Sequence, residues 1–140
     1  MTLNIGGVDL LSVAAAAVAG MAIGFAWYSP MLFGNMWMKE LGMSKKDMEK
    51  KKKSMTYNFG IMFVAVLLMA YVLAYTIKLM GTPTIVNGLT AGFWLWLGFG
   101  ATISATSFLF EGRTFKFYLI NAAHHLAVFL AMGAILGMWP

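Results

Sequence analysis

Cysteine is absent from the 140 residues, which excludes disulfides and thiol chemistry. Charge is scarce as well: charged residues make up 11% of the chain, against roughly a quarter in an average soluble domain, so a soluble fold is not expected. There is also no glycine-rich phosphate loop, no Gly-x-Ser-x-Gly elbow and no pair of carboxylates within one apolar stretch. Residues 1–9 contain no Lys or Arg, so the first apolar stretch lacks the basic region of a cleavable secretory signal.

The chain contains long hydrophobic stretches. Hydrophobic residues make up 61% of it, and a bilayer core of ~30 Å needs about 20 apolar residues per crossing helix. Four stretches meet this requirement, at about residues 8–28, 57–79, 85–110 and 115–138. We therefore predict an all-α, polytopic membrane protein with a single domain of four transmembrane helices.

The first connection carries several turn and cap signals. Pro30 lacks a backbone donor and is expected to end the first span, after which residues 31–41 are expected to lie along the membrane interface. Gly42 can adopt the left-handed conformation that closes a helix, and Ser44 with Asp47 resembles a capping box for the next one. Aromatic rings in this region are expected at headgroup level, and they belong to Trp27, Tyr28 and Trp37.

The basic residues predict an orientation. The formal net charge is +5, and seven of the ten basic residues fall between Lys39 and Lys53, which is a topology signal and gives no reason to expect a nucleic-acid partner. The first and third connections are thus expected in the cytoplasm, with both termini outside the plasma membrane. Lysines at the start of the second span would contact membrane lipid headgroups, mainly to fix topology, and these are Lys50, Lys51, Lys52 and Lys53.

Several motifs together resemble a known family. The stretch from Trp27 to Gly34 reads Trp-Tyr-Ser-Pro-Met-Leu-Phe-Gly, with Trp37 and Gly42 following. Later matches are Trp96-Leu97-Gly98-Phe99, Phe110-Glu111-Gly112 and Asn121-Ala122-Ala123-His124-His125. This pattern resembles the bacterial membrane family known as domain of unknown function 1761. The resemblance implies a small membrane protein of roughly four helices, and it brings no activity, cofactor or catalytic residue.

The densest polar set within a span is Asn121, His124 and His125 in the fourth. A histidine there can pass protons, or bind a metal or haem, whereas the structural alternative is an interhelical hydrogen bond. We favour the structural alternative over the proton or solute pathway, and both over a cofactor site. No cofactor is predicted, because the pair has no carboxylate or cysteine at ligand spacing within its helix.

Other polar residues are weaker candidates. The third span ends in hydroxyls, among them Thr102 and Thr106, which can line a wet cavity but more often bond back to their own helix. Glu111 follows this span and is read as an interfacial ion pair unless it turns inward. Asp9 is interpreted as a cap of the first helix.

Small residues at four-residue spacing mark helix contact faces, because they let helix backbones approach closely in lipid. Three spans carry them, and these indicate a slight preference for a homo-oligomer. The faces are Ser12, Ala16, Gly20 and Gly24 in the first span, Gly88 and Gly92 in the third, and Gly133 and Gly137 in the fourth.

Three functions remain open at this point. The leading hypothesis is an oligomeric protein that passes protons or a small solute through a polar cavity between the third and fourth spans. The alternative is a non-transporting scaffold or a module that binds a partner protein or lipid. A metal- or haem-dependent membrane enzyme is third, and overall an enzyme is less expected than a non-enzyme.

Overall fold

The computed structural model describes residues 4–139, apart from the side chains of residues 52 and 53. Four of its helices are long and apolar enough to cross a membrane, at Leu10–Trp27, Ser54–Leu79, Ile85–Leu109 and Phe115–Met138. The prediction of four such helices is confirmed. The expected lipid contacts of the Lys52 and Lys53 side chains lie outside the described part of the chain.

The order of elements follows the four spans closely. In chain order they are β1 (Asn4–Ile5), β2 (Val8–Asp9), α1 (Leu10–Trp27), α2 (Gly34–Leu41), α3 (Lys45–Lys50), α4 (Lys52–Leu79), α5 (Ile85–Leu95), the π-helix η1 (Trp96–Ala101), α6 (Thr102–Leu109) and α7 (Phe115–Met138). The two short strands pair antiparallel, with Asn4 opposite Asp9 and Ile5 opposite Val8.

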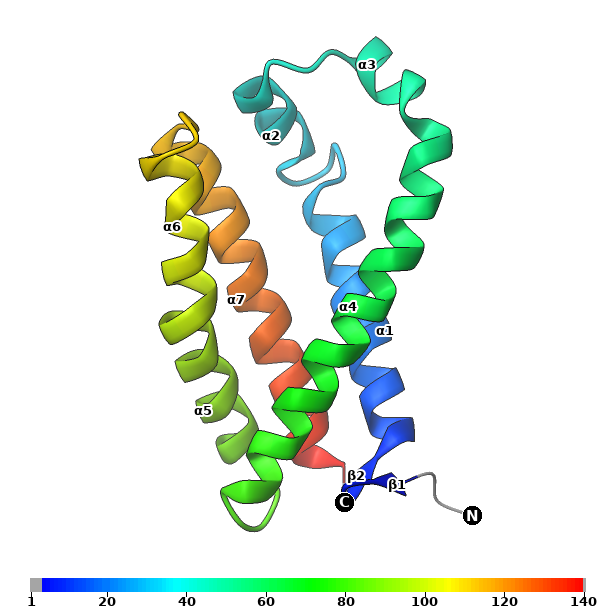
Figure 1. Ribbon diagram of the computed structural model, residues 1–140, viewed down its shortest axis with the longest axis vertical. Coiled ribbons are helices and arrows are strands. Elements are labelled where there is room, and N and C mark those ends of the chain that lie inside the picture. The colour runs from blue at the N-terminus through cyan, green and yellow to red at the C-terminus, as the bar shows by residue number, and fades with distance from the viewer. Residues whose placement is uncertain (1–3, 140) are drawn as a thin grey trace.

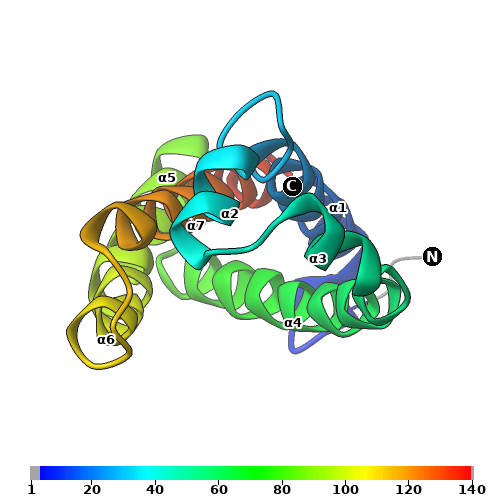
Figure 2. The same cartoon turned by 90° about the horizontal axis from the view of Figure 1, so that it is seen from above.

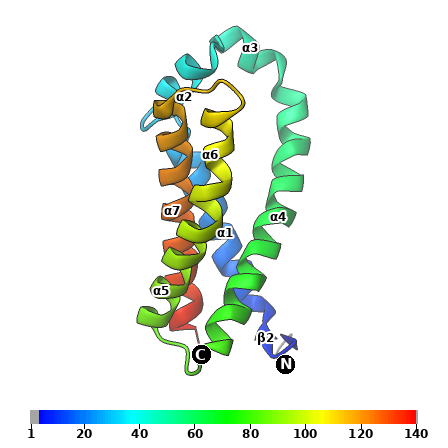
Figure 3. The same ribbon diagram turned by 60° about the vertical axis from the view of Figure 1, so that its left-hand side comes forward.

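Helix α7 lies at the centre of the bundle, with α1 on one side and α5 on the other (Figure 1). One end of the molecule carries α2, α3 and the connection between α6 and α7, and we call it the basic end because Lys39, Lys45, Lys46, Lys50 to Lys53, Arg113 and Lys116 belong to it. The other end carries the strands, the turn between α4 and α5 and the last turn of α7, and we call it the terminal end. Helix α4 packs against the others near the terminal end and diverges from α5 and α6 toward the basic end (Figures 2 and 3).

Helix caps follow local sequence chemistry. The Asp9 carboxylate accepts from the Leu11 backbone N–H at 3.0 Å, as predicted, and Ser44 with Asp47 forms the predicted capping box of α3. Gly42 closes α2 at φ 72°, in the left-handed region. Two threonines that we did not single out, Thr84 and Thr114, cap α5 and α7 in the same way.

The dry core occupies the half of the bundle near the terminal end, where α1, α4 and α7 meet. Ala16 and Ala17 of α1, Leu73 of α4 and Met132 of α7 have no exposed surface. Burial of such apolar side chains fixes the crossing of the three helices, and it leaves the polar residues of α7 nearer the basic end.

The small-residue faces are used within the chain. A Cβ at Gly88 would overlap the carbonyl oxygen of Gly133, and one at Gly137 would overlap that of Thr84, so α5 and α7 are in backbone contact. On α1, Gly20 faces α4 and α7 less closely, because a Cβ there would lie 3.2–3.3 Å from side-chain atoms of Val66, Val128 and Met132. The expected homo-oligomer therefore stays a prediction and requires a surface other than these faces.

The π-helical turn η1 was not foreseen. Such turns are rare and occur frequently at functional sites. Here it places Trp96 so that its indole N–H donates to the Ala122 carbonyl at 2.8 Å, while the Tyr118 hydroxyl donates to the Ala101 carbonyl at 2.9 Å. These two bonds attach the third span to the segment of α7 that carries Asn121 and His124.

Candidate polar site between the first and fourth spans

A tight loop after α1 sets the geometry of the site. Its backbone is held by bonds from the Phe33 N–H to the Trp27 carbonyl at 2.9 Å and from the Gly34 N–H to the Ser29 carbonyl at 3.0 Å. A Cβ at Gly34 would overlap the Tyr28 carbonyl oxygen, so this turn requires glycine. The loop thereby fixes the last two aromatic residues of the first span relative to α7.

Both aromatic residues bind α7 through their polar atoms. The Trp27 indole N–H donates to the carbonyl of Ile120 at 3.0 Å, and the Tyr28 hydroxyl donates to Oδ1 of Asn121 at 2.5 Å. The Tyr28 ring also contacts Trp37 of α2, with ring centroids 5.3 Å apart. Hydrogen bonds between residues 93 positions apart thus join the beginning of the chain to its last helix.

His124 lies beside this pair, one helical turn from Asn121. Its ring centroid is 5.0 Å from that of Tyr28 and 6.2 Å from that of Trp27. A Cβ at position 24 would lie 3.3 Å from the His124 Nε2, so Gly24 leaves the imidazole just enough room against α1. Helices α1 and α7 therefore enclose the His124 ring between the aromatic rings of Trp27 and Tyr28 on one side and Gly24 on the other.

Neither ring nitrogen of His124 has a hydrogen-bond partner, although both are buried. Within residues 4–139 they are the only buried side-chain nitrogen or oxygen atoms in this condition. A neutral imidazole offers one donor and one acceptor, and leaving a buried polar group unsatisfied costs about 1–3 kcal/mol. Such a group calls for an explanation, and a functional role or a bound solvent molecule is a common one.

The depth of the site follows from its place in α7. His124 is nine residues after Phe115, which corresponds to roughly 14 Å along a helix whose residues rise 1.5 Å each. Toward the terminal end the path is closed by apolar contacts, because the side chains of Val66, Val128 and Met132 crowd around Gly20. The imidazole thus lies at the boundary between the dry core and the aromatic residues near the basic end.

Comparison with known families places this geometry in context. The family model described as "Protein of unknown function (DUF1761)" matches residues 11–137. The chain belongs to this family. No curated protein and no solved structure matches the chain, so the DUF1761 assignment brings no relative of described activity. The match spans the whole site, from Gly24 to His125.

In this DUF1761 protein the predicted polar residues separate into two groups. Asn121 and His124 come together with Tyr28, and the ring of His125 lies 5.1 Å from that of His124. Thr102 and Thr106 instead donate to carbonyls of their own helical segment, those of Gly98 and Ile103. Glu111 is exposed at the basic end. The site therefore involves the first and fourth spans, and the hydroxyls of the third span are bonded locally.

Sequence reasoning assigned Trp27 and Tyr28 to the membrane interface and missed their contacts with α7. A signal was present, because Tyr28 follows Gly24 by four residues and so lies on the same helical face as the small residues. An aromatic residue that continues a small-residue face reaches the same neighbour as the glycines do.

The donor set for a metal ion is thin. Among residues 4–139, no three His, Cys, Asp or Glu side chains are grouped closely enough to hold an ion. The rings that contact His124 are those of Trp27, Tyr28 and His125, none of which carries a carboxylate. What the arrangement offers is a set of neutral hydrogen-bonding groups in an aromatic enclosure.

Proposed function

We propose that this DUF1761 protein binds a proton or a small neutral solute at His124 and carries it across the membrane. The observation that supports the proposal is the pair of buried, unpartnered ring nitrogens of His124. A bound species with both a hydrogen-bond donor and an acceptor would satisfy both of them. A polar group in a span is costly to place, and retaining one without a protein partner favours a functional role.

The chemistry of the enclosure favours a proton or an uncharged solute. The groups around the imidazole are the Tyr28 hydroxyl, the Asn121 amide, the Trp27 ring and the second imidazole of His125, and none of them is a carboxylate. Tyr28 already donates to Asn121 Oδ1, so the amide NH₂ of Asn121 stays available to donate to a solute. An inorganic ion would lose its hydration in this enclosure without gaining an opposite charge, whereas a proton need only pass through the imidazole and does not have to stay bound there.

We propose that the protein works as a carrier and not as an open pore. The site borders the dry core of α1, α4 and α7, so a continuous wet path toward the terminal end would have to pass Val128 and Met132. Transport then requires α1 to move relative to α7 near Gly24, where the contact is made by a glycine and an unbonded ring.

We also propose the orientation in the membrane. The basic end would face the cytoplasm, so both termini would lie outside the plasma membrane. The sequence has no cysteine, so single cysteines can be introduced without background. In intact cells an impermeant maleimide should label Thr82→Cys and spare Ser44→Cys. Labelling of Ser44→Cys alone would reverse the orientation.

The test of transport is flux in liposomes that contain a pH-sensitive dye. Wild-type protein should dissipate an imposed pH gradient faster than empty liposomes, and His124→Leu should return the rate to that background. His125→Leu is the matched control, because it removes the neighbouring imidazole but not the orphaned one. Equal rates for wild type and His124→Leu would refute proton transport through His124. The same variants, given labelled small solutes such as urea and glycerol, would test transport of a neutral solute.

A cofactor-dependent enzyme stays as a competing proposal for the same residues. Purified wild-type protein with a stoichiometric metal, or with a haem absorption band, that is lost in His124→Leu would favour it over the carrier. A non-transporting scaffold would be favoured by wild-type liposomes that resemble empty ones for every species tested.

A further inference from the structure

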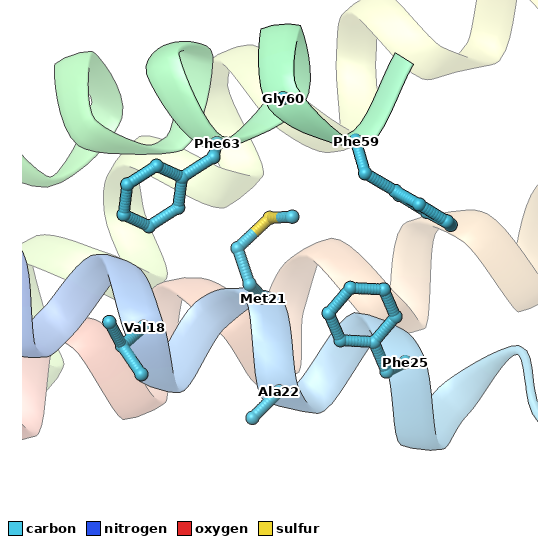
Figure 4. A pocket seen from close by; sticks show the side chains of 7 residues that line it. All are labelled: Val18, Met21, Ala22, Phe25, Phe59, Gly60 and Phe63. Carbon is cyan, nitrogen blue, oxygen red and sulfur yellow. The ribbon is translucent and has the colours of Figure 1, made fainter. Parts of the chain in front are cut away.

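A second feature of the molecule lies away from His124. An apolar groove of about 420 Å³ runs between α1 and α4 on the outer surface of the bundle (Figure 4). One wall is formed by α1 and the other by α4, and the Phe25 and Phe59 rings meet edge to face across it at 5.0 Å. The residues that line it are Val18, Met21, Ala22, Phe25, Phe59, Gly60 and Phe63.

In a bilayer this groove cannot remain empty. Its walls belong to two of the four helices that are apolar enough to cross the membrane, so its opening faces lipid. An empty groove would deprive its lining of dispersion contacts, and the part of an occupant that lies in the groove must be apolar. The volume is within the range of about 300–1,000 Å³ that is typical of small-molecule sites.

The position of the groove relative to charge points to the nature of the occupant. Phe59, at one end of the groove, is eight residues after Lys51, which corresponds to roughly 12 Å along α4. Lys50 and Lys51 are exposed, and the Asp47 carboxylate one turn before Lys51 acts electrostatically on Lys51. A molecule with an acyl chain in the groove would thus carry its headgroup toward a cluster of basic residues.

We infer that the groove between α1 and α4 is a binding site for one acyl chain of an anionic phospholipid, whose headgroup binds Lys50 and Lys51. A second copy of the chain fits less well. The small-residue faces that support close helix contact are used internally, and a stable protein interface needs about 1,200–2,000 Å² of buried surface rather than one narrow slot.

Gly60 provides the means to test this inference. Outside its own stretch of helix, no atom lies within 4 Å of the place where its Cβ would be, so Gly60→Leu starts a larger side chain into the groove from an open position. Gly98 of η1 is equally open and lies on another span, so Gly98→Leu is the matched control. Ala22→Leu narrows the groove from the opposite wall and serves as a second variant if Gly60→Leu fails to fold.

The measurement is native mass spectrometry of protein purified in mild detergent and then given equal amounts of phosphatidylglycerol and phosphatidylcholine with identical chains. Wild type and Gly98→Leu should retain phosphatidylglycerol at least about tenfold better than phosphatidylcholine, and Gly60→Leu should lose most of this retention. Lys50→Gln with Lys51→Gln should remove most of the preference, because each lysine contributes about 1 kcal/mol, or about fivefold, whereas Arg113→Gln with Lys116→Gln should leave it unchanged.

Three results would overturn the inference. One is equal retention of the two lipids by wild type, which would reduce the groove to general lipid contact. Another is unchanged phosphatidylglycerol binding in both Gly60→Leu and Ala22→Leu. The third is a wild-type dimer that either filling variant dissociates, which would make the groove a contact between two copies of the chain.

Discussion

Replacing His124 with leucine should stabilise this protein, although most substitutions within a packed span destabilise. Leucine is similar in size to the imidazole and has no polar atoms. The substitution therefore removes two buried nitrogens that lack partners and keeps most of the contact with Gly24 and Tyr28. If His124 had a structural hydrogen bond, the same change would instead remove a favourable interaction.

The expected magnitude follows from these two alternatives. An unsatisfied buried polar group costs about 1–3 kcal/mol, and a water molecule that enters the site offsets part of this cost. We therefore expect His124→Leu to raise the free energy of unfolding by about 1 kcal/mol. A lost interhelical hydrogen bond would lower it by about 0.6 kcal/mol on average, so the two readings differ in sign.

The assay is reversible unfolding in mixed micelles of a mild detergent and sodium dodecyl sulfate, followed by circular dichroism and tryptophan fluorescence. His125→Leu is the control, because its nitrogens are not among the orphaned buried atoms and it should shift stability less. A clear destabilisation by His124→Leu, with His125→Leu unchanged, would refute the reasoning and assign His124 a structural role.

Further predictions concern packing, the polar pair and pH. Gly88→Ala should destabilise by about 1–3 kcal/mol or more, because its Cβ would overlap backbone of α7, while Gly60→Ala should be tolerated in the same unfolding assay. Tyr28→Phe and Asn121→Ala should each cost about 0.5–1.5 kcal/mol, and a double-mutant cycle should give a coupling energy of that size, with additive effects as the contrary outcome. Hydrogen bonds from the N-cap serine of α3, first its backbone N–H and then its hydroxyl, hold the pKa of Asp47 below the ordinary 3.8. The stability that this carboxylate gives α3 is thus present above pH 3.8 and lost as pH falls through the lowered pKa. Nuclear magnetic resonance of the α3 amides should follow this loss. Asp47→Asn should abolish the pH dependence.

The fold was largely predictable because it depends on strong local signals. Four apolar stretches of sufficient length define the helices, and the cap residues Asp9, Gly42 and Ser44 act within a few residues of their own position. The π-helical turn was not predictable, since Gly98 and Gly100 permit such a turn without requiring it. Trp96 and Ala101 of this turn are bonded to α7, and sequence order does not reveal these contacts.

The site was only half predictable for a related reason. Composition alone singles out Asn121, His124 and His125, because polar residues are rare in the spans, and it does not distinguish the two histidines. Their partners Trp27 and Tyr28 lie 93 residues away from the groups that they bind, and aromatic residues at the end of a span serve equally well as interface anchors. Only the rotation of α1 against α7, which packing determines, distinguishes these two roles.

The central claim is that the nitrogens of His124 are satisfied by a mobile external species instead of by the protein. Nuclear magnetic resonance of ¹⁵N-histidine-labelled protein in lipid nanodiscs tests it directly, with His124→Leu used to assign the signals. The account predicts that at least one His124 nitrogen shows a cross peak to water or to exchanging protons. A bound solute should displace that water and remove the cross peak. Slowly exchanging nitrogens that are coupled to a protein carbonyl or hydroxyl would contradict it.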